Sequence, residues 1–133
     1  MSSLFTRTSA VIPALGATDL TGKEGYTVTL SVVSSNLTAT LSASATAPST
    51  GVILDGAVAA KNSGIGILGA LSGTVRLKTS GAINAGARVQ QAADGTIVTD
   101  AGTGARVVIG VALETAASGD LIEVATFTPL TLS

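Results

Sequence analysis

The sequence predicts an all-β protein, a small β-barrel or β-sandwich of short antiparallel strands that carries an extended N-terminal arm. Apolar residues alternate with serine and threonine along much of the chain, and this period of two is typical of strands. The apolar segments are short and end at glycine-containing turns, as they do in sandwiches and barrels. No segment has a convincing helical period, although residues 57–61 could form a short turn.

The first 25 residues differ from the rest because they have no sustained periodicity. They contain Pro13, Gly16, Gly22 and Gly25, and Pro13 would interrupt a helix. We therefore expect an extended arm over 1–25 and a β domain over 26–133. Such an arm can gain order against a partner, and a frayed terminus accounts for the same pattern equally well.

The segment Tyr26–Leu41 predicts a β-hairpin. Val28, Leu30 and Val32 alternate with hydroxyl residues, and the alternation resumes at Leu37 after the polar turn at 34–36. The following residues, 42–50, are small and polar and predict a loop.

From Gly51 onward, short apolar segments predict further strands, separated by turns at 55–56, 72–73, 94–95, 102–104 and 118–120. The segment 105–126 predicts a hairpin around Ser118-Gly119-Asp120. A fainter version, at 64–79, predicts a repeated hairpin, although chance similarity is an alternative in so glycine-rich a chain. The core is expected to include Val107, Ile109, Val111, Leu113 and Val124.

Composition argues against catalysis. The chain has no histidine and no cysteine, which excludes imidazole bases, thiol nucleophiles, disulfides and thiolate metal sites. Residues 64–69 match G-x-G-x-x-G by letter, but they lie in an apolar strand without a βαβ unit. The neighbouring carboxylates resemble turn or surface residues: Asp94, Asp100, Glu114, Asp120 and Glu123. We therefore expect no enzyme, no catalytic residues, no cofactor and no metal.

Charge and apolar content restrict the partners. The seven basic residues are dispersed, which argues against nucleic acid. The uncharged span between Glu24 and Asp55 alternates with hydroxyl residues, as strands do, so no membrane segment and no secretory signal are expected. Aromatic residues make up 2% of the chain and charged residues 11%, which predicts a thin core and a surface covered by neighbours.

The segment 78–126 resembles bacteriophage capsid decoration (cement) proteins of the DUF2190 type. The resemblance lies in the order of three short patterns, a G-x-I-x-A-G-x-x-V step, a turn with a following valine, and I-G-V-A-L-E-x-A-x-x-G-x-x-I-x-V. The matching residues are Gly81, Ile83, Ala85, Gly86, Val89, Asp94, Gly95, Val98, Ile109, Gly110, Val111, Ala112, Leu113, Glu114, Ala116, Gly119, Ile122 and Val124.

This resemblance implies a small β-rich structural protein on the exterior of a phage capsid. Such proteins bind the major capsid protein, typically as homotrimers, and stabilise the shell. The N-terminal arm is then expected to supply the capsid-binding residues or to contact the next subunit, through Leu4, Phe5, Val11, Ile12 and Leu15. The alternative is a carbohydrate-binding or fibre-base module on a virion or cell surface. The shortage of aromatic residues, which sugar sites usually present, argues against glycan binding.

Overall fold

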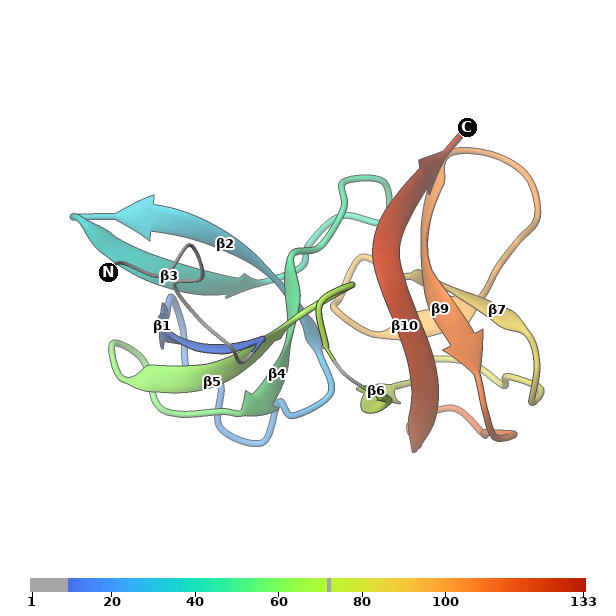
Figure 1. Ribbon diagram of the computed structural model, residues 1–133, viewed down its shortest axis with the longest axis horizontal. Helices are drawn as coiled ribbons and strands as arrows, with labels where there is room; N and C mark the ends of the chain where they lie inside the picture. The colour runs from blue at the N-terminus through green and yellow to red at the C-terminus, as the bar shows by residue number, and fades with distance from the viewer. Residues whose placement is uncertain (1–9, 72) are drawn as a thin grey trace, which may run out of the picture.

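The computed structural model describes residues 10–71 and 73–133, which form ten strands and no helix. The strands make two five-stranded halves that lie side by side (Figure 1). The prediction of an all-β fold with a small barrel is confirmed.

The N-terminal half is a closed barrel in the order β1-β3-β2-β4-β5. Its strands are β1 (Val11–Gly16), β2 (Thr27–Val33), β3 (Asn36–Leu41), β4 (Gly51–Asp55) and β5 (Asn62–Ile67). The predicted hairpin is present as β2 and β3, and its turn is Ser34-Ser35. β1 closes the barrel by pairing in parallel with β3 and antiparallel with β5.

The C-terminal half is a curled sheet in the order β6-β10-β9-β7-β8. Its strands are β6 (Val75–Lys78), β7 (Arg88–Gln91), β8 (Ile97–Thr99), β9 (Arg106–Ala112) and β10 (Leu121–Leu132). The predicted C-terminal hairpin is present as β9 and β10, and β10 runs beyond the expected end at Thr126. A parallel bridge between Thr79 and Ile97 joins the end of β6 to the far edge strand β8.

The prediction of an arm over 1–25 is wrong for the residues that the structure describes. Residues 11–16 form a barrel strand, and the completely buried Leu20 fills the barrel core with Ala14. Backbone hydrogen bonds also hold the following segment, from Leu20 N to Ala57 O and from Gly25 N to Ile53 O, both 2.9 Å. The segment that forms β1 is short and contains Pro13, so its sequence does not predict a strand. It is a strand because it pairs with residues far along the chain, in β5.

The predicted repeat of the C-terminal hairpin at 64–79 is also wrong. The two strands of this segment, β5 and β6, lie in different halves and do not pair with each other. The chain turns at Gly69, two residues after the end of β5, where φ is 85° and where an added β-carbon would collide with Thr128. This close approach leaves no space for a side chain and directs the segment toward the second half.

The expected core is present only in part. Val107, Ile109 and Val124 are fully buried, whereas Val111 is half-buried and Leu113 is 46% exposed. The cause is a β-bulge at Ile109. Val89 of β7 lies opposite Gly110 of β9, and the next residue, Gln90, lies opposite Val108, so Ile109 is an extra residue in β9. Such a bulge reverses the faces of the residues that follow it, so Ala112 points into the core in place of Val111 and Leu113.

The two halves are joined through Gln91, which is completely buried in β7. Its side-chain oxygen accepts hydrogen bonds from Ser49 N (3.0 Å) and Ser49 Oγ (2.9 Å). Its amide nitrogen donates to Ser44 O (2.7 Å) and Ala47 O (2.6 Å). The loop between β3 and β4 of the barrel is thereby fixed to the C-terminal sheet.

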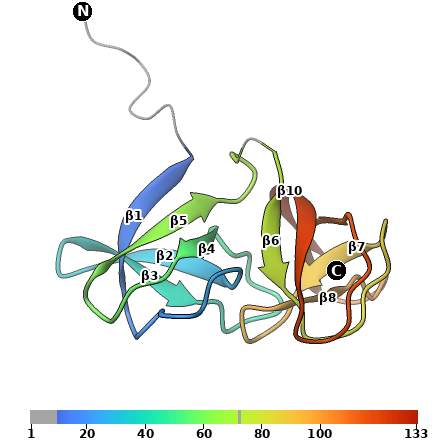
Figure 2. The same cartoon turned by 90° about the horizontal axis from the view of Figure 1, so that it is seen from below.

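Apolar contacts and a backbone bond strengthen this junction. Val52 and Leu68 come from the N-terminal part of the chain but belong to the core cluster of the C-terminal sheet. The backbone nitrogen of Thr27 donates to Gly95 O at 2.8 Å. Figure 2 shows the two halves in contact along one side of each. Residues 26–133, the expected β domain, therefore form four strands of the barrel and all of the sheet, and each half has its own core cluster.

Candidate functional site

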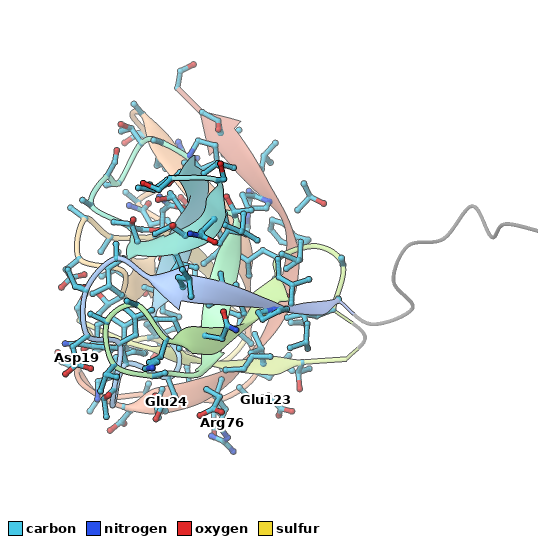
Figure 3. All side chains as sticks on the ribbon, turned by 90° about the vertical axis from the view of Figure 1, so that its left-hand side faces the viewer. Asp19, Glu24, Arg76 and Glu123 are labelled. Atoms are coloured by element: carbon cyan, nitrogen blue, oxygen red, sulfur yellow. The ribbon has the colours of Figure 1, made fainter. Side chains whose placement is uncertain are left out.

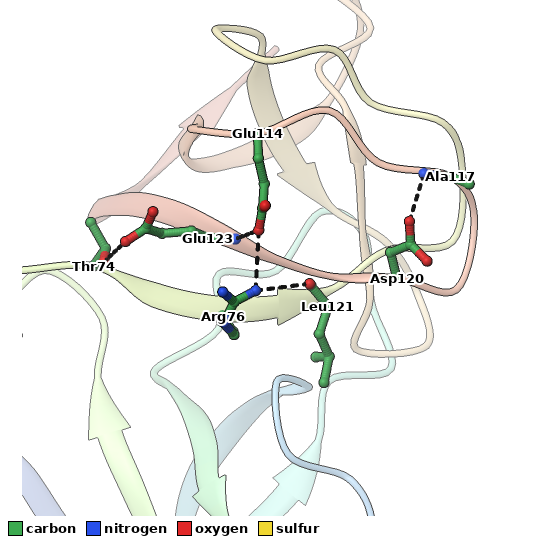
Figure 4. Close-up of polar contacts among 7 residues, drawn as sticks. All are labelled: Thr74, Arg76, Glu114, Ala117, Asp120, Leu121 and Glu123. Carbon is green, nitrogen blue, oxygen red and sulfur yellow. Dashed lines mark hydrogen bonds and ion pairs between the residues drawn. The ribbon is translucent and has the colours of Figure 1, made fainter.

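The carboxylates of the C-terminal hairpin hold the strands together (Figure 4). Glu114 Oε1 accepts hydrogen bonds from the backbone nitrogen of Glu123 (2.7 Å) and from Arg76 Nη1 (3.1 Å). Glu123 in turn accepts a bond from the Thr74 hydroxyl at 2.6 Å. Asp120 accepts one from Ala117 N at 2.9 Å, which closes the turn between the strands. Each of these carboxylates has a structural partner, and none of these contacts places two of them as an acid–base pair.

The two remaining candidate carboxylates, Asp94 and Asp100, also stabilise local structure. Asp100 accepts bonds from Gly102 N (3.0 Å) and Arg106 Nε (2.5 Å). The Gly102 backbone hydrogen bond, followed by Arg106, lowers the pKa of Asp100 below its usual value. A hydrogen bond from the Thr96 side chain lowers the pKa of Asp94. Both groups are therefore held in the ionised form, which is the opposite of what a proton donor near neutral pH requires.

Other potential sites in the described residues lack the necessary geometry. Gly64 and Gly66 lie within β5, so the G-x-G-x-x-G letters do not precede a helix that could hold a phosphate. Among residues 10–71 and 73–133, no three acidic side chains gather as metal ligands would.

No helix in the described part of the chain has the length and apolar character needed to cross a bilayer.

Two shallow apolar grooves lie where the halves meet. The larger has a volume of about 370 Å³ and no charged residue in its lining, which consists of Pro48, Ser49, Thr50, Ile67, Leu68, Thr128 and Pro129. The smaller, of about 200 Å³, is lined by Glu24, Gly25, Ile53, Leu54, Val75, Arg76 and Leu121. Neither brings together the set of convergent polar groups that orients a small ligand.

Among the described residues, the two most exposed large apolar side chains, Val32 and Val33, are at the end of the β2–β3 hairpin. We call residues Val32–Leu37 the hairpin tip. Val32 is 72% exposed, Val33 56% and Leu37 39%. In Figure 1 the hairpin tip is at the far left, at the end of the molecule remote from the C-terminal sheet. The signal in the sequence is the pair Val32-Val33, where the alternation with hydroxyl residues stops just before the turn.

Of the five predicted capsid-binding residues, the structure describes Val11, Ile12 and Leu15, and these three do not share one face of β1. Leu4 and Phe5 lie outside the described residues. Ile12 packs against the barrel core, on the opposite face of β1 from Val11 and Leu15. Val11 is 41% exposed, whereas Leu15 is half-buried and pairs with Thr38 and Asn62.

Comparison with known proteins identifies the fold. The chain is similar in structure to the N base of the head fibre protein gp8.5 of bacteriophage phi29, with a TM-score of 0.70 and 16% sequence identity. The similarity covers 90% of this chain and 96% of the phi29 chain, so it includes both halves. No family model matches this chain, so the resemblance to the DUF2190 type is not confirmed, and no curated protein matches it.

Proposed function

We propose that this chain is a structural protein of a bacteriophage virion and that it attaches to the exterior of the head by binding the major capsid protein. The observation that carries the proposal is the similarity to the phi29 head fibre base over nearly the whole of both chains. A match to one half could reflect a common small barrel, whereas this similarity covers 90% of the chain and therefore extends over both of its five-stranded halves.

The chemistry of the described residues is consistent with a structural role. The carboxylates that could have served hydrolysis bind backbone nitrogens, hydroxyls or arginines. Of the large apolar side chains that the structure describes, the two most exposed, Val32 and Val33, are on a protruding hairpin, where a macromolecular partner can reach them. Binding to a shell needs contact surface and rigidity, and it needs no reactive group.

Two forms of this role differ in what the bound protein carries. A decoration protein completes the head surface by itself, whereas a fibre base holds a further fibre. The similarity to a fibre base favours the second form, and the sequence resemblance to decoration proteins favours the first.

The test is to mix the purified protein with expanded, undecorated heads of the phage that encodes it and to sediment the particles. We expect the protein to sediment with the heads at saturable stoichiometry and to be visible as regular external density by electron microscopy. The same protein mixed with unexpanded heads controls for nonspecific adsorption. Absence of binding to expanded heads at high micromolar concentration would contradict the proposal.

A further inference from the structure

We propose that the hairpin tip is a wedge that inserts into an apolar, uncharged depression on the head shell. This inference rests on the proposed function and names the surface that makes the contact.

The hairpin tip has apolar side chains on both faces. Val32 pairs with Leu37, and both share the face on which Val28 and Leu30 contact the barrel core. Val33 pairs with Asn36 and points to the opposite face. Val33 therefore adds an apolar group on the face of the hairpin that does not cover the core, where another molecule can contact it.

The turn fixes the shape of this wedge. Ser34 and Ser35 have φ values of 50° and 66°, a left-handed conformation that glycine or asparagine adopts more readily. Two successive residues of this kind make the tight turn that suits the twist of a hairpin. A wedge shaped in this way loses little conformational freedom on binding, which favours affinity.

The charge distribution determines the chemistry of the partner. No charged residue lies between Glu24 and Asp55, so the whole hairpin is uncharged. In the view of Figure 3, the labelled side chains Asp19, Glu24, Arg76 and Glu123 lie along one lower margin of the molecule. A charged surface would lose its hydration against this hairpin without gaining an ionic partner, whereas an apolar depression would match it.

The contact area argues against a dimer that is held by the hairpin tip alone. Three partly exposed side chains can bury roughly 300 Å² at most, well below the about 800 Å² per partner of a stable protein pair. The hairpin tip alone cannot hold two copies together. It can act as an anchor that fills a pocket, the type of contact that supplies much of the binding energy in larger interfaces. Its position at one end leaves the C-terminal sheet pointing away from the anchored end (Figure 1).

The experiment compares head binding by the wild-type chain and by a Val32→Asp, Val33→Asp variant. The matched control is Val58→Asp, Leu130→Asp, which places the same charges at positions 53% and 46% exposed. We expect the tip variant to bind heads at least about 30-fold more weakly, the loss typical of an interface hot spot. The control should bind within about threefold of wild type, and both variants should keep the wild-type melting temperature to within the small range of surface substitutions.

The outcomes separate this inference from the proposed function. If wild type binds and the tip variant binds equally well, the inference is wrong and the proposed function stands. If wild type does not bind, both are wrong. If the aspartate substitutions lower the melting temperature, a Val32→Thr, Val33→Thr variant replaces them in the test. Threonine keeps the branched shape of valine, so this variant should fold normally and bind heads more weakly than wild type. A change in oligomeric state of either tip variant would place the tip between subunits and overturn the inference.

Discussion

Gln91 makes four hydrogen bonds inside the protein, and they link the β3–β4 loop to β7. A Gln91→Leu substitution keeps the approximate volume but leaves Ser49 N, Ser44 O and Ala47 O without this partner. Each buried polar group without a hydrogen bond costs about 1–3 kcal/mol.

We therefore expect Gln91→Leu to lower the free energy of unfolding by roughly 2–5 kcal/mol, since the loop can recover part of its hydrogen bonding with water. Urea denaturation measures the loss. Gln90→Leu, which removes one exposed bond to Ala101 N, is the control and should cost about 1 kcal/mol or less. Equal losses for the two variants would show that the Gln91 contacts do not hold the halves together.

Ile109 and Leu113 were expected to be equivalent core residues, and the bulge makes them different. We expect Ile109→Ala to destabilise the protein by roughly 2–5 kcal/mol, because it leaves a cavity in a closed core. Leu113→Ala should change stability by less than about 1 kcal/mol, because the Leu113 side chain is largely exposed. Thermal unfolding of both variants measures the contrast, and similar losses would contradict the bulge as the reason for the difference.

Acid should destabilise the fold through Asp100 and Asp94, whose pKa values are lowered in the folded state. Their stabilising contribution is complete above the unfolded pKa of about 3.9 and is lost as the pH falls through the lower folded values. The melting temperature should therefore fall steeply below about pH 4. Asp100→Asn should reduce the acid-dependent part of the fall. A melting temperature that rises on acidification from pH 5 to pH 2 would contradict this assignment.

At the level of elements, β1 is necessary to close the barrel. Deletion of Met1–Ala17 removes the strand that pairs with both β3 and β5, and it exposes the barrel core around Leu20. Deletion of Met1–Ser9 leaves β1 intact. We expect cooperative melting close to wild type for the short deletion and loss of cooperative melting for the long one, measured by circular dichroism. A long deletion that melts normally would show that the barrel does not need β1.

The short deletion also tests the predicted role of Leu4 and Phe5. Both are large apolar residues in a segment that precedes the barrel, and we expect their removal to weaken co-sedimentation with heads several-fold. The control is Leu4→Ala with Phe5→Ala in the full chain, which should reproduce the loss. If the short deletion and the double alanine variant both bind heads as tightly as wild type, Leu4 and Phe5 have no role in attachment, and the described part of the chain must make the contact.

Elements with long alternation and clear turns could be predicted from the sequence. The hairpin of β2 and β3 and the hairpin of β9 and β10 have both, and each is formed by neighbours in the chain. β1 could not be predicted, because its strand character depends on pairing with β5, about fifty residues away. The bulge at Ile109 has no local signal, and one extra residue is sufficient to reverse the faces beyond it.

For the whole molecule, we expect a homotrimer in solution or on the head. The reasons are a low content of charged residues and exposed apolar side chains on both halves, such as Leu54 and Leu121 beside one groove. Sedimentation velocity over the micromolar range measures the assembly, and sedimentation with heads measures subunits per site. A monomer in both conditions would contradict the expectation.

How the barrel packs against the C-terminal sheet could not be predicted from the sequence, and the reason is physical. The residues that join them, Gln91, Ser49 and Val52, are a buried amide, a loop serine and a strand valine, and each has an ordinary role within its own half as well. The exposed hairpin tip could not be predicted from the sequence either. Val32 continues the alternation of a core-facing strand, and only the length of the hairpin beyond the barrel leaves it uncovered.

The position of β10 in its sheet has a consequence for synthesis of the protein on the ribosome. All five barrel strands lie between residues 11 and 67, so the barrel can close while the rest of the chain is still being made. The second sheet cannot, because β10 lies between β6 and β9 and is translated after the nine other described strands. Until it emerges, β6 has no neighbour within its sheet except the single bridge from Thr79 to Ile97. Loss of residues 122–133 would therefore separate β6 from the β9-β7-β8 part of its sheet, whereas loss of residues 1–9 leaves every described strand in place.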